Sequence, residues 1–469
     1  MSRAARVNRR PASVTLARWV AWRAIYRTFT EDAWTDRAWA GEAERAGLDG
    51  RDRAFSQRCA FGTVQQAKRI DHVIATVGKR PLRKLDPPVL AALRLGVFEL
   101  LDGSGADDHA AVSQAVDLVR ATVGERAVAF TNAILRRSAV DAHDILSRLD
   151  EHDLADRAVL LSMPEWLVRR MYEQHGEIGC DALAALNHAA PHTSFRINTV
   201  RAAGADIDAQ LAEADVEVVD VDDVLSAACP DARMVAGRTS EVSSLIESGL
   251  IQPQGRASQL AALALDVQPG DRVLDLCAAP GGKTMVLAAQ LAGAGSVTAC
   301  DIHEHRAASI SYLASRMGVS GLVHVVCADA RNMESDHLFD RVLVDAPCSG
   351  VGVLGRRPDA RWKLTEEQIS ELANLQGAIL SRAAQLVRPG GSIIYATCTL
   401  LREECERVVE AACEAKIDGV PRLEHARLSE RVPRELWIDD HGTMARIWPH
   451  RAEADGFFIA HMRRGELAP

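Results

Sequence analysis

The sequence contains no C-x-x-C pair, although ten cysteines are spread over its 469 residues. That absence excludes a zinc ribbon and a thioredoxin-type redox pair, and we expect no metal site. No apolar run approaches the ~20 residues that a membrane span requires, so no membrane partner is expected. Scattered cysteines are typical of a reducing compartment, which predicts a cytoplasmic protein.

Basic residues are also fewer than acidic residues. The 55 Lys and Arg are outnumbered by 64 Asp and Glu, which gives a formal net charge of −9. This balance excludes a uniformly basic nucleic-acid binder but leaves room for local basic patches. One such patch opens the chain, where arginines precede the first acid, Glu31. We interpret residues 1–12 as a basic disordered tail, and a transit peptide is the alternative.

The length predicts two or three domains. Residues 13–148 show only helical patterns, such as the stripe Leu90, Leu93, Val97 and Leu101, and predict an all-α bundle. Residues 155–250 mix helix and strand patterns and predict a small α+β module. Residues 255–466 alternate strand, turn and helix, which predicts an α/β domain with a parallel, doubly wound sheet.

The α/β domain carries its most informative residues directly after apolar runs. Strands are expected at 272–277, 296–300, 322–327, 341–345 and 392–397, with a last strand in Asp455–Ala460. Ligands of doubly wound sheets bind at the carboxyl ends of the strands. We therefore expect a site where these runs end.

The first run ends in a small-residue loop: Cys277, Ala278, Ala279, Pro280, Gly281, Gly282, Lys283. Its glycines let the backbone approach a ligand, and the helix that follows favours negative charge at its start. A phosphate-binding P-loop needs a glycine where Cys277 stands, and the dinucleotide fingerprint G-x-G-x-x-G is absent. An S-adenosyl-L-methionine site fits better.

Acids follow the next two strands. Asp301 comes after the second strand, where a carboxylate can accept from ribose hydroxyls, and Asp329 comes after the third, where it could accept from an adenine amine. One such aspartate alone could be a helix N-cap. Acids at the ends of successive strands favour a cofactor site.

Two thiols follow the last two strands of this series. Cys348 lies in Asp345-Ala346-Pro347-Cys348-Ser349-Gly350, and Cys398 lies in Tyr395-Ala396-Thr397-Cys398-Thr399. Neighbouring strands lie about 4.8 Å apart, so both thiols would reach one pocket. Adding a thiolate to carbon 6 of a pyrimidine makes carbon 5 nucleophilic enough to take a methyl group. Asp345 is placed to hydrogen-bond ring nitrogen 3.

A basic segment follows the first of these thiols. It contains Arg356, Arg357, Arg361 and Lys363 together with Trp362, which predicts phosphate contacts and base stacking. A solvated loop anchored by one tryptophan is the alternative.

These motifs resemble the Nop2/Sun family of RNA cytosine-5 methyltransferases over nearly the whole chain. The motifs that carry the resemblance are Leu274–Thr284, Asp345–Gly350, Tyr395–Thr399 and Asp455–Ala460. Residues 155–250 resemble the family's small RNA-recognition-like module. The helical part resembles the antitermination factor NusB at His109–Val112 and Asn132–Arg137, which implies an RNA-binding domain.

The resemblance implies roles for particular residues. Cys398 would be the nucleophile, Cys348 would help to release the product, and Asp345 would contact both cofactor and base. DNA cytosine-5 methyltransferases use the Pro-Cys thiol as nucleophile and lack the second thiol, so the pair favours RNA. The chain departs from the family at Thr399, where Ser is common, at Arg402-Glu403-Glu404, where Asn-Glu-Glu is common, and at Gln252–Ser258.

The expected function is therefore S-adenosylmethionine-dependent methylation of cytosine in small-subunit ribosomal RNA, either free or in an assembling particle, by a monomer. The NusB-like part favours ribosomal over transfer RNA as substrate. A non-catalytic ribosome-assembly factor is the third hypothesis, and the intact site residues argue against it.

Overall fold

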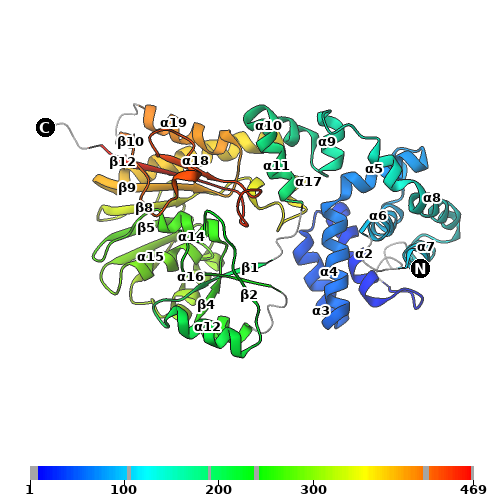
Figure 1. Ribbon diagram of the computed structural model, residues 1–469, viewed down its shortest axis with the longest axis horizontal. Helices are drawn as coiled ribbons and strands as arrows, with labels where there is room; N and C mark the ends of the chain where they lie inside the picture. Colours follow the sequence, from blue (N-terminus) through cyan, green and yellow to red (C-terminus); the bar gives the residue numbers. More distant parts are fainter. Residues whose placement is uncertain (1–8, 103–106, 188–191, 237–241, 416–421, 466–469) are drawn as a thin grey trace. The chain divides into compact units, whose positions relative to one another are not determined.

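The computed structural model describes residues 9–102, 107–187, 192–236, 242–415 and 422–465. The chain divides into two compact units, one of residues 1–187 with 354–364 and one of residues 188–353 with 365–469. Figure 1 shows the first as helices alone and the second as helices and sheets.

The first unit is built from helices joined by short turns. Its helices are α2 (Leu16–Thr30), α3 (Thr35–Ala46), α4 (Gly50–Gln65), α5 (Ala67–Gly78), α6 (Pro87–Asp102), α7 (Asp108–Thr122), α8 (Val128–Ser147), α9 (Leu154–Leu160), α10 (Glu165–His175) and α11 (Glu177–Ala185). Pro88 stands in the first turn of α6, where its missing N–H costs no hydrogen bond. The buried side chains include Trp22, Leu93 and Leu135, and they form one core.

This unit is longer than the predicted bundle of residues 13–148. Helices α9, α10 and α11 belong to it, although the sequence groups them with the α+β module. The apolar side chain of Val159 on α9 packs into the helical core, which explains the difference.

A segment distant in sequence completes the first unit. Residues 354–364, which contain the one-turn helix α17 (Ala360–Lys363), pack among its helices. The Trp362 indole N–H donates to the Val64 carbonyl oxygen at 2.7 Å, and Asp359 accepts from the Thr35 backbone N–H at 3.1 Å. Loss of these contacts would expose part of the helical core.

The second unit begins with a four-stranded antiparallel sheet in the order β2-β3-β1-β4. Its strands are β1 (Thr193–Ile197), β2 (Val218–Val219), β3 (Ala232–Val235) and β4 (Ile251–Pro253), with helices α12 (Gly204–Glu213) and α13 (Ser243–Glu247). Alternate residues of β1, such as Phe195 and Ile197, point into the module's core. The mixed helix and strand patterns of this region therefore correspond to a small α+β module.

The larger sheet has eight strands, in the order β10-β12-β9-β8-β5-β6-β7 with β11 beside β12. They are β5 (Arg272–Leu276), β6 (Ser296–Asp301), β7 (Val323–Cys327), β8 (Phe339–Asp345), β9 (Val387–Thr397), β10 (Leu423–His425), β11 (Met444–Ile447) and β12 (Phe457–Arg464). The pairs among β5 to β9 are parallel, and β12 runs antiparallel to β9. The chain order reverses at β5, beside β8, and such a switch point forms a crevice for ligands.

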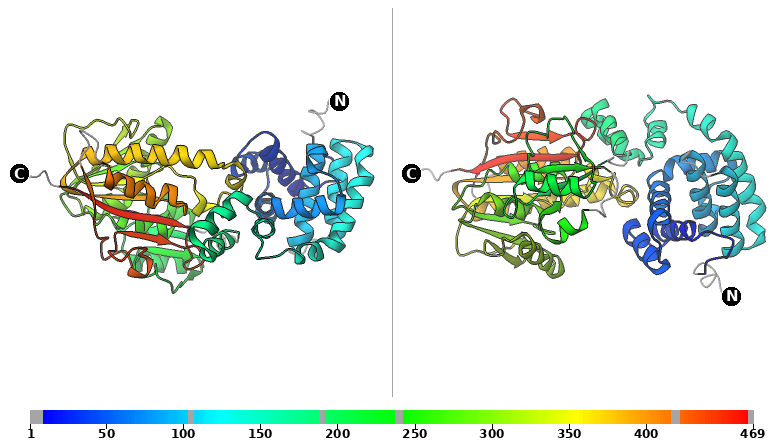
Figure 2. Two further views of the ribbon diagram at one scale, coloured as in Figure 1. Left: turned by 90° about the horizontal axis from the view of Figure 1, so that it is seen from above. Right: turned by 60° about the horizontal axis from the view of Figure 1, so that its bottom comes forward.

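Helices cover both faces of this sheet (Figure 2). The covering helices are α14 (Arg256–Leu263), α15 (Gly282–Gln290) and α16 (Glu304–Met317) on one face and α18 (Glu366–Leu386) and α19 (Glu406–Glu414) on the other. Successive side chains of a strand point to opposite faces of the sheet. Val273 of β5 therefore packs with α14, α15 and α16, whereas Leu274 packs with α18 and α19. The five predicted parallel strands are confirmed. The three- and four-residue strands β10 and β11 are too short to leave a pattern.

Candidate functional site

The loop after β5 forms the cofactor-loop part of the site. The Ala278 backbone N–H donates to the Cys300 carbonyl oxygen at 2.8 Å, which ties the loop to β6. Gly281 has a φ of 104°, a conformation that side-chain-bearing residues rarely adopt, and a Cβ there would lie 3.4 Å from the Cα of Ile310. Helix α15 then starts at Gly282. The loop thus offers a ligand its backbone groups and the N-terminus of helix α15.

The two acids expected beside the loop lie at the ends of β6 and β7. The Asp301 side chain is 3 % exposed, and its carboxylate accepts from the backbone N–H groups of Ala279, at 3.3 Å, and His303, at 3.1 Å. Asp329 is more exposed and forms an ion pair with Arg331 at 2.6 Å. Asp301 therefore also fixes the loop, whereas Asp329 is held by a partner on the surface.

Lys283 and Asp345 join the ends of β5 and β8. The ammonium Nζ lies 2.7 Å from the Asp345 carboxylate and 5.1 Å from the centroid of the Phe457 ring. Burial disfavours the charge on Lys283, but attraction to Asp345 outweighs burial and raises the pKa of Lys283. Lys283 therefore keeps its positive charge at neutral pH and holds the Asp345 carboxylate in place.

The two cysteines lie in contact. Asp345 on β8 pairs with Ala396 on β9, so both strands end at the same level. The sulfur atoms of Cys348 and Cys398 are 3.3 Å apart. The hydrogen bond with Cys398, then burial and the repulsion from Glu404, raise the pKa of Cys348 well above its usual value. Cys348 thus keeps its proton at neutral pH.

A buried hydrogen-bond network fixes the Cys348 loop. The Glu404 carboxylate accepts from the Ser349 backbone N–H at 2.8 Å, from the Ser349 hydroxyl at 2.5 Å and from the Gln376 amide at 3.0 Å. Gln376 also donates to the Pro347 carbonyl oxygen at 2.9 Å, and the Ser349 and Thr399 hydroxyls are 2.9 Å apart. The network links the two thiol-bearing loops to α18 and to the turn before α19.

Sequence reasoning missed this network as part of the site. Glu404 stands in the Glu403-Glu404 pair after the thiol motif, which was the available signal. Gln376, in the middle of a helix, gave none. Burial raises the pKa of Glu404 against the effect of its hydrogen bonds.

Asp275 is a further acid of the site, and the sequence counts it among the intact site residues that argue against a non-catalytic role. It is fully buried at the end of β5, and its Oδ2 accepts from the Thr284 hydroxyl at 2.6 Å. Its Oδ1 has no hydrogen-bond partner among the described residues. Burial is the main cause that raises the pKa of Asp275 to about 7, and repulsion from Asp345 adds to it.

The cationic side chains of the basic segment differ in their exposure to solvent. Arg356 and Arg357 are exposed, but Arg361 is fully buried. Its guanidinium donates to the carbonyl oxygens of Ser162 and Leu354 and to the Asn187 side chain. The assignment of Arg361 to RNA contact is therefore wrong, because a buried, hydrogen-bonded guanidinium has no surface to offer a phosphate.

Lys363 is also engaged within the helical unit. Its ammonium donates to the Asp32 carbonyl oxygen at 2.7 Å and forms an ion pair with the Asp32 carboxylate at 3.0 Å. It also lies 4.4 Å from the centroid of the half-exposed Trp34 ring. Of the four predicted RNA-contacting cations, Arg356 and Arg357 have the most accessible side chains.

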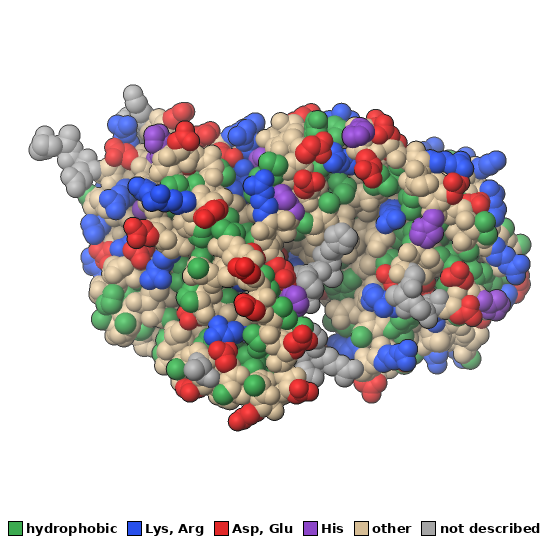
Figure 3. Space-filling view, in the orientation of Figure 1, with side chains coloured by type: hydrophobic (Ala, Val, Ile, Leu, Met, Phe, Trp, Pro, Cys, Tyr) green, Lys and Arg blue, Asp and Glu red, His purple; other side chains and the backbone are tan. Residues whose placement is uncertain are grey.

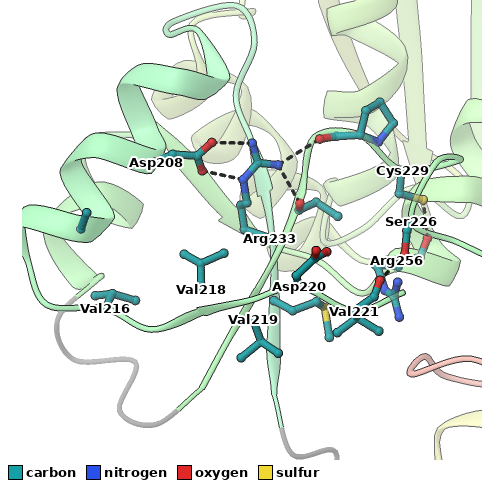
Figure 4. Close-up of a pocket in the computed structure, with 14 residues that line it drawn as sticks. Asp208, Val216, Val218, Val219, Asp220, Val221, Ser226, Cys229, Arg233 and Arg256 are labelled. Carbon is teal, nitrogen blue, oxygen red and sulfur yellow. Dashed lines mark hydrogen bonds and ion pairs between the residues drawn. The ribbon is translucent and has the colours of Figure 1, made fainter. Parts of the chain in front are cut away.

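Among the described residues, neither a metal cluster nor a membrane span competes with this site. No group of three or more His, Cys, Asp or Glu in the described ranges could hold a metal ion. No helix within those ranges is long and apolar enough to cross a membrane. A cavity of about 620 Å³ lies in the α+β module, but Arg233 there is already paired with Asp208 at 2.6 Å (Figure 4). None of the predicted site residues lines it.

The fold and the strand-end residues together fit S-adenosyl-L-methionine. The positive φ of Gly281 gives the loop a turn whose backbone can approach a ligand, and carboxylates stand at or just after the ends of β6, β7 and β8. A parallel sheet with a reversed last strand pair, a glycine turn after its central strand and two facing thiols defines an S-adenosylmethionine-dependent methyltransferase of the class that modifies RNA.

Comparison with known proteins gives the family. The model of the 16S rRNA methyltransferase RsmB/F family matches residues 262–463, that of the NusB family matches 15–140, and a ferredoxin-like domain of RsmF/B-like methyltransferases matches 163–232. The chain belongs to the RsmB/F family of ribosomal RNA methyltransferases, with an N-terminal NusB domain.

Relatives match along most of their length. The probable ribosomal RNA small subunit methyltransferase B of Bacillus subtilis is 31% identical over 89% of this chain and 92% of its own. The ribosomal RNA small subunit methyltransferase B of Pseudomonas putida is 31% identical over 88% of this chain and 91% of its own. The crystal structure of PH0851 superposes with a TM-score of 0.77 at 26% identity and covers 97% of this chain and all of that one.

Proposed function

We propose that this enzyme methylates carbon 5 of a cytosine in 16S ribosomal RNA through a covalent bond to Cys398. The observation that carries the proposal is the 3.3 Å contact between the sulfur atoms of Cys398 and Cys348 beside the Lys283–Asp345 ion pair. A methyltransferase that acts on a nitrogen or oxygen atom needs no thiol, whereas carbon 5 must first be activated.

The reaction divides between the two thiols. The Cys398 thiolate forms a bond to carbon 6, and the electron pair of the 5,6 double bond becomes available at carbon 5. When bound, S-adenosylmethionine would supply the methyl group to carbon 5, with its methyl–sulfur bond broken and S-adenosylhomocysteine left behind. A base then removes the proton from carbon 5, the double bond re-forms, and the sulfur–carbon bond to Cys398 breaks. Cys348, which keeps its own proton in the free enzyme, is placed to assist this release.

The remaining site residues hold the two reactants. Residues 277–283 form the cofactor loop, Asp301 and Asp329 accept hydrogen bonds from the nucleoside part, and Asp345 contacts cofactor and base. The ion pair with Lys283 fixes the Asp345 carboxylate for this role. The Ser349–Glu404–Gln376 hydrogen bonds keep Cys348 in place.

A surface of the helical unit offers an RNA contact. Arg356 and Arg357 line a cavity of about 210 Å³ together with Arg37 and Trp34, which is 41 % exposed. Cations beside an exposed aromatic ring suit phosphate contacts and base stacking. On the face of the molecule in Figure 3, acids and bases are interspersed, so binding should depend on such local groups.

The test uses wild type, Cys398→Ala and Cys348→Ala with cofactor and unmodified 16S ribosomal RNA, free or in a small-subunit particle. Wild type should form 5-methylcytidine, and Cys398→Ala should form none. Cys348→Ala should accumulate a protein–RNA adduct that survives a denaturing gel. Cys405→Ala is a matched control, because that thiol is buried nearby and contacts the Thr397 hydroxyl and the Thr399 carbonyl oxygen.

Three outcomes would contradict parts of the proposal. An adduct with Cys348 rather than Cys398 would reverse the two roles. Methylation of transfer RNA alone would keep the chemistry and change the substrate. Absence of any methylated base or adduct with every RNA, despite cofactor binding, would favour a non-catalytic role in ribosome assembly.

A further inference from the structure

Gln254 connects the α+β module to the start of the cofactor helix. It follows β4 and precedes α14, and its backbone is held on both sides by Ser194 of β1. The Gln254 N–H donates to the Ser194 carbonyl oxygen at 3.1 Å, and the Ser194 hydroxyl donates to the Gln254 carbonyl oxygen at 2.9 Å. The module thus fixes where this side chain begins.

Arg196 sets the orientation of the Gln254 side chain. Its Nε–H donates to the Gln254 Oε1 at 3.1 Å, so the amide oxygen faces the guanidinium and the NH₂ group points the other way. Burial lowers the pKa of Arg196 to about 10, which leaves it charged at neutral pH. The guanidinium therefore holds the amide in one of its two orientations.

The amide nitrogen of Gln254 is buried without a partner among the described residues. The residue is 8 % exposed, and Nε2 lies 3.5 Å from the position that a Cβ on Gly282 would take. Gly282 opens α15, a helix of nine residues whose first N–H groups have no partner within the helix. A buried donor and a helix N-terminus at one point together favour a bound carboxylate.

We propose that Gln254 donates a hydrogen bond to the carboxylate of the methionine part of S-adenosylmethionine, in an orientation set by Arg196. The inference rests on the proposed cofactor loop at residues 277–283. It gives the α+β module a role in cofactor binding, because Arg196 and Ser194 of β1 position the donor.

The test compares two ligands that differ only in the carboxylate: S-adenosylmethionine and its decarboxylated form. Calorimetry on the full chain gives both dissociation constants for wild type and Gln254→Leu. The variant should bind S-adenosylmethionine roughly tenfold or more weakly and the decarboxylated ligand equally well. Gln254→Glu keeps the length of the side chain and places a negative charge there, so it should show a larger loss for S-adenosylmethionine alone.

Gln290→Leu is the matched control. It removes another buried amide without a partner among the described residues, at the opposite end of α15, and should leave both affinities unchanged. Thermal melting without ligand establishes that each variant folds.

If folded Gln254→Leu lost affinity equally for both ligands, the proposal would be overturned. If it lost affinity for neither, the proposal would also be overturned, and water would satisfy the amide. If wild type bound neither ligand, the cofactor loop itself would be refuted. Failure of the cofactor loop can be told apart from failure of the Gln254 proposal, because it would already appear in the wild-type measurement.

Discussion

The carboxyl edge of the large sheet and the basic segment Arg356–Lys363 were both predicted to bind ligands, but their predicted site residues differ in burial. At the sheet edge, the sulfur atoms of Cys348 and Cys398 are in contact, and Lys283 forms an ion pair with Asp345. In the segment, Arg361 points into the helical core, whereas Arg357 is exposed. Short side chains after parallel strands are placed by the backbone. Long cationic side chains take their direction from tertiary packing, so residue type alone does not give their function.

The largest expected effect beyond the two thiols comes from Glu404, which holds the sheet edge together. Glu404→Ala removes the acceptor for Ser349 and Gln376, so the Cys348 loop should lose its position. We expect kcat to fall about 100-fold, the cost of misplacing a reacting group by about 1 Å. The cofactor dissociation constant should not change. Single-turnover methylation and calorimetry measure the two quantities.

Glu404→Gln provides the control for this prediction. Its side-chain oxygen can still accept from Ser349 N–H and Gln376, and its amide can donate to the Ser349 hydroxyl. Most activity should therefore return. If the glutamine variant were as slow as the alanine variant, the charge of Glu404 would matter rather than its positioning of the loop.

The second prediction tests the structural role of the basic segment. Arg361→Met removes the donor for the carbonyl oxygens of Ser162 and Leu354, which would stay buried. The free energy of unfolding of the helical unit should fall by about 2–4 kcal/mol. Arg357→Gln, an exposed change in the same segment, should alter it by no more than about 0.5 kcal/mol. Urea unfolding followed by tryptophan fluorescence measures both, and equal values would remove the contrast between these arginines.

The third prediction uses the buried acid of the sheet edge. Because the pKa of Asp275 is raised to about 7, the folded protein keeps a proton that the unfolded chain releases near its ordinary value of 3.8. Stability is therefore lost as the pH rises from about 4 to about 7 and is constant above that. Asp275→Asn does not ionise. Its free energy of unfolding should improve relative to wild type by about 2–3 kcal/mol between pH 5 and pH 8, as measured by urea unfolding.

A constant difference between the two proteins at both pH values would contradict a raised pKa of Asp275. Thr284→Val separates the hydrogen bond from burial, since it removes the donor to Asp275 Oδ2. That change should raise the pKa of Asp275 further and extend the loss of stability to higher pH.

The contrast also explains what the sequence could predict. The five parallel strands could be predicted because each apolar run ends in a turn rich in Gly, Asp or Pro-Cys. The site residues could then be predicted because they stand at the ends of these strands. Strands β10 and β11 were missed because each is four residues or shorter. Glu404 and Gln376 act only through contacts between α18, the turn before α19 and the Cys348 loop. Patterns in the sequence cannot predict contacts between elements that are distant along the chain. The contact of Gln254 with the position beside Gly282 could not be predicted for the same reason.

The smallest effect is expected for the exposed arginines, and it tests whether this part of the segment contacts RNA. Arg357→Gln should weaken binding of 16S ribosomal RNA about fivefold and lower the slope of log affinity against log salt by about one, because one phosphate contact is lost. Filter binding from low to physiological salt gives both numbers. Arg169→Gln is the control, since Arg169 is exposed but pairs with Glu165 at 2.9 Å. If both substitutions changed the slope equally, RNA binding would reflect total charge and the cavity beside Trp34 would have no special role.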